Sequence, residues 1–89
     1  METNQKLTHV EIITKIDQLL AAQMEIDAAT LKPEVHLFDG LGMDSLDAID
    51  LVMAIHKEFK VKPEEQELQA LRHLGDVHTL VQKYYDKIN

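Results

Sequence analysis

The chain has 89 residues, no cysteine and a formal net charge of −7. This length predicts a single domain, residues 1–89, whose modest core leaves little room for a deep enzyme pocket. The lack of cysteine excludes disulfides, thiolate nucleophiles and thiolate metal sites. The acidic balance argues against nucleic acid and favours protein partners with basic surfaces, although solubility alone would also explain it.

The amino-terminal stretch 1–6 is polar and predicts a flexible tail rather than a signal peptide. No apolar run approaches the length that crosses a membrane. We therefore expect a cytoplasmic monomer that does not insert into membranes.

A first helix is predicted from about Thr8 to about Gln23. Thr8 and Glu11 have the spacing of a capping box, and Leu7 and Ile12 have that of a hydrophobic staple. Apolar residues then recur at helical spacing, and we expect this stripe to face the core. The stripe consists of Val10, Ile13, Ile16, Leu19 and Leu20.

The helical period is lost between Met24 and Met43, where Pro33, Gly40 and Gly42 interrupt the chain. A loop of this length in a small domain needs a function or an anchor. Its apolar side chains are expected to pin it across the helices. They are Ile26, Leu31, Val35, Leu37, Phe38 and Leu41.

A second helix is predicted from about Asp44 to about Phe59, with Asp44 as its N-cap. Ser45 then lies at the first turn, where several backbone N–H groups lack helical partners and the positive end of the helix dipole points. A phosphate on this hydroxyl would find an anion site. An Asp–Ser pair at a helix start is, however, also explained by capping alone.

This second helix is apolar on two sides. Leu51, Val52, Ile55 and Phe59 share the natural core face. The other apolar side carries Leu46, Ile49 and Met53, next to Asp50 and Lys57. It is a candidate contact surface unless the helix is buried all round.

A short third helix is predicted to start at Lys62 to Glu65, with Pro63 as its first residue, and to end near Ala70 or Leu71. A fourth helix is expected to start between residues 73 and 76. It carries Leu74, Val77, Leu80, Val81, Tyr84 and Ile88. The sequence therefore predicts an all-α, four-helix bundle with a long first loop and a short third helix.

Other chemistry finds little support in the sequence. The acids Asp39, Asp44, Asp47 and Asp50 lack EF-hand spacing, so we expect a solvated face with weak cation binding at most. The five histidines lack metal-ligand spacing, and no Gly-x-Ser-x-Gly motif surrounds the serine. We assign no catalytic residue and no metal ligand.

The segment from Phe38 to Asp47, FDGLGMDSLD, resembles the attachment segment of acyl carrier proteins, and the resemblance continues to Phe59. It implies a stand-alone carrier without catalysis, with 4′-phosphopantetheine on Ser45 and with Asp44 positioning the segment. Ser45 is also the only serine in the chain. A phosphopantetheinyl transferase would supply the arm from coenzyme A. Thioester-bound acyl groups would then be presented to enzymes such as a ketosynthase, reductase or acyltransferase of fatty-acid, polyketide or specialised lipid biosynthesis.

The family's partner enzymes dock on the second helix. The resemblance therefore implies partner contacts at Leu46, Asp47, Ile49, Asp50, Met53, His56 and Lys57. Many fatty-acid carriers have acids where this chain has His56 and Lys57, which favours a dedicated pathway. The alternatives are an aminoacyl or peptidyl carrier, an unmodified carrier-like domain, and a small hydrolase, which would lack a second catalytic group near Ser45.

Overall fold

The structure is a computed structural model that describes residues 7–88, so the predicted tail lies outside the described residues. Its helices are α1 (His9–Met24), α2 (Ser45–Phe59), α3 (Glu65–Gln69) and α4 (Leu74–Ile88). A short 3-10 turn, η1 (Ala28–Thr30), lies in the first loop. No β-strand occurs between residues 7 and 88. The predicted all-α class, four helices, long first loop and short third helix are confirmed.

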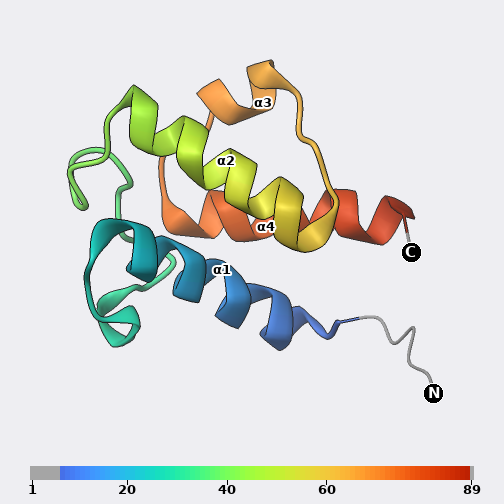
Figure 1. The fold of residues 1–89 in the computed structure, drawn as a ribbon, viewed down its shortest axis with the longest axis horizontal. Coiled ribbons are helices and arrows are strands. Elements are labelled where there is room, and N and C mark those ends of the chain that lie inside the picture. Colours follow the sequence, from blue (N-terminus) through green and yellow to red (C-terminus); the bar gives the residue numbers. More distant parts are fainter. Residues whose placement is uncertain (1–6, 89) are drawn as a thin grey trace.

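Figure 1 shows α1 running in the opposite direction to α2 and α4. The first helix packs against both of the others. The short α3 lies on the far side of α2 from α1, and the start of α2 lies at the end of the bundle opposite the start of α1 and the end of α4 (Figure 1). None of the described helices is both long enough and apolar enough to span a bilayer.

The predicted caps of α1 and α2 are present. Thr8 Oγ1 accepts from the Glu11 amide at 3.1 Å, and Glu11 Oε1 accepts from the Thr8 amide at 2.8 Å. Two of the four orphan amides at the start of α1 are thereby satisfied reciprocally. Leu7, just before the cap, packs partly buried against the core.

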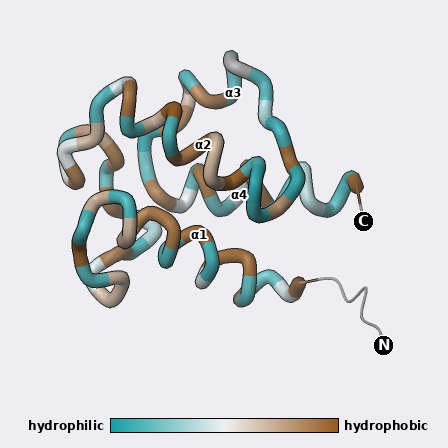
Figure 2. Tube along the Cα trace, in the orientation of Figure 1, coloured by the Kyte–Doolittle hydropathy of each residue, from teal (hydrophilic) through white to brown (hydrophobic). Residues whose placement is uncertain are grey.

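The core is a stripe on each of the three long helices, and Figure 2 shows apolar positions recurring along them. In α1 the fully buried residues are Ile12, Ile16 and Leu20. Val10 was predicted to face the core but is 70 % exposed, because the buried stripe is centred on Ile12 and its helical repeats. In α2, Leu51, Ile55 and Phe59 are buried as predicted, whereas Val52 of the same predicted face is only partly buried.

The first loop is anchored by apolar side chains and by backbone hydrogen bonds. Leu31 and Leu37 are buried as expected, whereas Ile26 is exposed and does not pin the loop. The Leu37 amide donates to the Arg72 carbonyl at 2.8 Å, and the Leu74 amide donates to the Val35 carbonyl at 2.9 Å. The loop before Ser45 is thus held against the segment that starts α4.

In the second half of the chain, the predicted start of the third helix is wrong, and the predicted start of the fourth helix is confirmed. Pro63 is buried and precedes α3, whose N-cap is Glu64, so the prediction that Pro63 opens the helix is wrong. The fourth helix begins at Leu74, inside the predicted window. The Gly75 amide, in the first turn, donates to the Pro33 carbonyl at 2.8 Å. The close approach favours glycine because an added Cβ would lie 3.2 Å from that oxygen.

Candidate functional site

Ser45 is the first residue of α2, and its side chain is exposed. Asp44 precedes it as the N-cap with extended backbone, and Asp44 Oδ1 accepts from the Asp47 amide at 2.9 Å. Asp47 Oδ2 in turn accepts from the Asp44 amide at 3.2 Å, which completes a capping box. The hydroxyl therefore projects from a well-defined helix start, at the positive end of the α2 dipole.

Glycine is favoured at two positions before Ser45, Gly40 and Gly42, for two different structural reasons. Gly42 has φ of +75°, a left-handed conformation that side chains rarely adopt, and the space around it is open. At Gly40 an added Cβ would lie 2.6 Å from the His36 carbonyl oxygen. The chain turns tightly here, because the Gly40 amide donates to that oxygen at 2.9 Å and the Gly42 amide donates to the Phe38 carbonyl at 2.9 Å.

His36 organises this turn, a role that its sequence position did not indicate. Its Nδ1 accepts from the Phe38 amide at 3.2 Å and from the Asp39 amide at 3.0 Å. Since both partners are donors, Nδ1 carries no proton in this arrangement. The ring also packs edge-on against His73, with centroids 5.2 Å apart. The imidazole thereby ties the loop to the start of α4.

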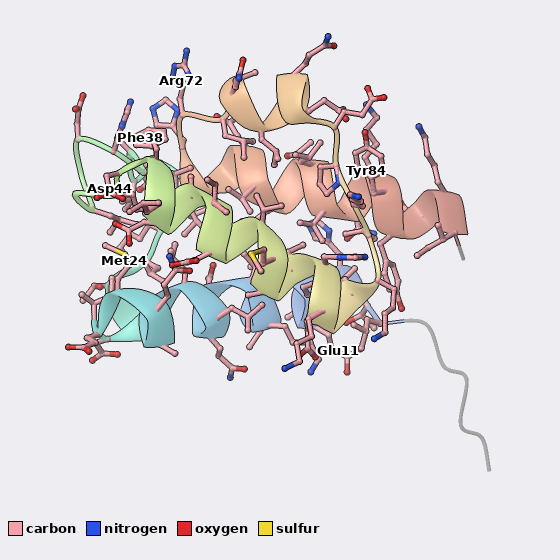
Figure 3. All side chains as sticks on the ribbon, turned by 45° about the horizontal axis from the view of Figure 1, so that its top comes forward. Glu11, Met24, Phe38, Asp44, Arg72 and Tyr84 are labelled. Carbon is pink, nitrogen blue, oxygen red and sulfur yellow. The ribbon has the colours of Figure 1, made fainter. Side chains whose placement is uncertain are left out.

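An apolar groove of about 450 Å³ opens beside Ser45, between the first half of α2 and the end of α3. A much smaller apolar cavity of about 30 Å³ lies deeper, among α2, α3 and α4. Four side chains line both spaces: Phe38, Ala48, Val52 and Leu68. Figure 3 shows Phe38 and Asp44 at the same end of the bundle, near Arg72.

The short helix α3 forms one wall of this groove and is held onto α4 by a polar contact. Lys83 Nζ lies 3.0 Å from Glu67 Oε2, and the Tyr84 hydroxyl donates to Glu67 Oε1. The Lys83 hydrogen bond holds the pKa of Glu67 below its ordinary value. Leu68 and Gln69, which line the groove, follow directly after Glu67, so this contact sets the position of the wall.

The predicted second face of α2 is exposed. Leu46, Ile49 and Met53 are 71 %, 55 % and 64 % exposed, so the alternative that α2 is buried all round is wrong. Asp50, His56 and Lys57 are also exposed. Asp47 is only half-exposed, because the side chain of Gln23 reaches its backbone from α1.

The acids and histidines do not converge on a metal site. Within residues 7–88, no group of three or more His, Asp or Glu side chains is arranged to hold a metal ion. Of the acids near Ser45, Asp44 and Asp47 bond to each other's amides. These two carboxylates therefore serve the helix start.

The phosphopantetheine attachment site family matches residues 14–81 of this chain, a stretch that contains the groove and the α2 start. The chain belongs to the acyl carrier protein family. It is 34 % identical over 73 residues to an acyl carrier protein of Thermotoga maritima, an alignment that covers 82 % of this chain and 90 % of that protein. It is 48 % identical over 66 residues to acyl carrier protein AcpXL of Rhizobium meliloti, covering 73 % and 68 % of the two chains.

The same family is found among solved structures. A crystal structure of an acyl carrier protein from Thermotoga maritima superposes with a TM-score of 0.78 at 30 % identity, covering 99 % of this chain and 100 % of that chain. As a member of this family, our chain holds acyl groups on a 4′-phosphopantetheine prosthetic group. Acyl carriers work with phosphopantetheinyl transferases and acyl-processing enzymes in general. The aminoacyl or peptidyl carrier alternative is not favoured.

Proposed function

We propose that Ser45 is the attachment point of 4′-phosphopantetheine and that Asp44 positions it. The observation that carries this proposal is the exposed Ser45 hydroxyl at the first residue of α2, beside an open apolar groove. A phosphate joined to Ser45 Oγ would lie near the unpaired first amides and the positive dipole end of the helix. Gly42 itself adds no side chain to the left-handed turn that precedes this hydroxyl.

The groove suits the inner part of the arm and the first carbons of an acyl chain. Its lining is mostly apolar, and burying apolar carbon there is favourable by about 25 cal/mol for each Å² removed from water. Gln69 adds a side-chain amide that can hydrogen-bond the amide groups of the arm. The four side chains shared with the deeper cavity separate the two spaces, so a longer acyl chain would enter by displacing them.

We also propose that this protein is a carrier without catalysis of its own. A general base must lie within hydrogen-bond reach of the proton that it removes. None of the eight residues that line the groove has a side chain that titrates near neutral pH. The transferase would therefore supply the chemistry that moves the arm from coenzyme A to Ser45 Oγ.

The exposed apolar face of α2 is the proposed docking surface for the transferase and for enzymes such as a ketosynthase, reductase or acyltransferase. Large exposed apolar side chains gathered on one helix are typical of contact surfaces. The partner contacts would come from Leu46, Asp47, Ile49, Asp50, Met53, His56 and Lys57. We propose a cytoplasmic monomer that serves a dedicated acyl pathway.

The experiment is incubation of the purified protein with coenzyme A and a phosphopantetheinyl transferase, followed by intact-mass measurement. The wild-type chain should gain one arm, and Ser45→Ala should gain none while melting at a similar temperature. Thr14→Ala removes another exposed helical hydroxyl and should gain the arm normally. Arm attachment to Ser45→Ala would refute the assignment.

A further inference from the structure

The exposed apolar strip of α2 lies between two opposite charges. Asp50 precedes Met53 by three positions and Lys57 follows it by four, so all three side chains share one side of the helix. The seven-residue separation places the two charges ~10 Å apart along the axis. Both charged residues are exposed. The surface therefore changes sign along its length, from negative near Ser45 to positive near the end of α2.

Within residues 7–88, Asp50 and Lys57 form no ion pair, unlike Glu58 of the same helix. Glu58, beside Lys57 in sequence, pairs with Lys15 of α1 at 3.3 Å. Asp44 and Asp47 are engaged in the capping box. The charges of Asp50 and Lys57 are available to a partner, whereas that of Glu58 is compensated.

Helix stability explains part of this placement, since acids near the start and bases near the end of a helix suit its dipole. It does not explain why Asp50, in the second turn, is exposed beside an apolar strip. The dipole effect also falls off within one turn of each end. The strip and the two charges therefore belong together as one contact surface.

We propose that α2 docks on an enzyme surface that also changes sign: basic opposite Asp50, apolar opposite Met53 and acidic opposite Lys57. This inference rests on the proposed function and names the chemistry of its partner. A docking surface that is basic throughout would meet Lys57 with like charge, and the mismatch would disfavour it. His56 adds positive charge only when protonated, so Lys57 carries the specificity.

The test uses a ketosynthase in which the charged residues of the docking surface are all Lys or Arg. Because the native chain has no cysteine, Lys57→Cys can be labelled at one position with a photoreactive maleimide. The enzyme residue that cross-links to this label faces position 57, and its change to Glu gives the second enzyme. Dissociation constants are then measured for wild-type and Lys57→Glu carriers with both enzymes at low and high salt. Lys32→Glu makes the same charge change in the first loop and serves as the control.

The wild-type carrier should bind the Glu enzyme about two- to fivefold more tightly than the original enzyme, the size expected of one exposed ion pair. The Lys57→Glu carrier should show the reverse preference, the Lys32→Glu control should behave as wild type, and high salt should shrink both differences. The same preference in both carriers, or no cross-link from position 57, would overturn the proposal. The dissociation constants are measured on carriers without the arm, so a failure of arm attachment, seen by intact mass, is recognised separately as a failure of the proposed function.

Discussion

Gln23 at the end of α1 donates from Nε2 to the backbone carbonyl oxygen of Asp47 at 2.7 Å. Asp47 belongs to the first turn of α2 and completes the cap that precedes Ser45. The hydrogen bond therefore joins the helix that carries the candidate attachment residue to α1, at the end of the bundle where the arm would be attached. A neighbouring element thus helps to hold the start of α2 in place.

Gln23→Ala should remove this link and destabilise the fold by about 0.5–1.5 kcal/mol, the net worth of one hydrogen bond. In a domain of this size that loss lowers the melting temperature by roughly 2–12 °C. Thermal unfolding followed by circular dichroism measures the change. Gln18→Ala, at an exposed position of the same helix, should leave the melting temperature nearly unchanged. Equal effects of the two substitutions would show that the contact with Asp47 contributes nothing.

The two faces of α2 should respond differently to truncation. Leu51 is 3 % exposed, so Leu51→Ala should cost about 2–5 kcal/mol through lost burial and the cavity left behind. Met53 lies on the exposed face, so Met53→Ala should change stability by less than about 0.5 kcal/mol. Denaturant unfolding measures both, and arm transfer to Met53→Ala should be slower than to wild type. Similar destabilisation by the two changes would contradict the assignment of the faces.

The contact between His78 of α4 and Asp17 of α1 should contribute to the stability of the fold. His78 Nε2 lies 2.8 Å from Asp17 Oδ1, and the His78 side chain is almost fully buried. Asp17→Ala would leave that ring nitrogen without its partner, at a cost of about 1–3 kcal/mol. A double-mutant cycle with His78→Ala, measured by urea unfolding, should show favourable coupling. Simple additivity of the two substitutions would mean that the pair is not coupled.

The hydrogen bonds of Asp76 at the start of α4 should make the stability of the fold depend on pH. Its carboxylate accepts from the amides of His73 at 2.9 Å and Arg72 at 3.1 Å, and these hydrogen bonds lower the pKa of Asp76 from its ordinary 3.8. A lowered folded-state pKa adds stability that is present above the unfolded value and is lost as pH falls through the lower folded value.

The melting temperature of wild type should therefore exceed that of Asp76→Asn at pH 7, and the gap should close as the pH falls below 3.8. Melting curves at several pH values measure this gap. Asp86→Asn, at an exposed acid in the last turns of α4, should show no comparable gap at pH 7. A gap for Asp76→Asn that is independent of pH would mean that its charge does not stabilise the helix start.

Local signals were enough to predict the starts of α1 and α2. Thr8 with Glu11, and Asp44 before an apolar run, are short-range patterns whose geometry depends on a few neighbouring residues. The two apolar faces of α2 followed from helical periodicity, and the exposure of Met53 agrees with it. The order of charges along α2 was also visible in the sequence.

Contacts between distant segments could not be predicted in the same way. The Asp17 to His78 pair spans 61 residues, and the turn organised by His36 depends on the segment that starts α4. Val10 fits a helical stripe, but only the packing of α1 against two other helices decides which stripe is buried. Pro63 fits a helix start, yet it is buried just before α3, where it lines the deeper cavity.

Tandem mass spectrometry of the protein purified from its natural source tests most directly whether Ser45 carries the arm. We expect 4′-phosphopantetheine, free or carrying an acyl group, on the peptide that contains Ser45, and fragmentation should place it on this residue. The mass beyond the arm would also identify the acyl cargo. An arm placed on any other residue, or a chain that stays unmodified in a host with an active transferase, would show that Ser45 is not the attachment point.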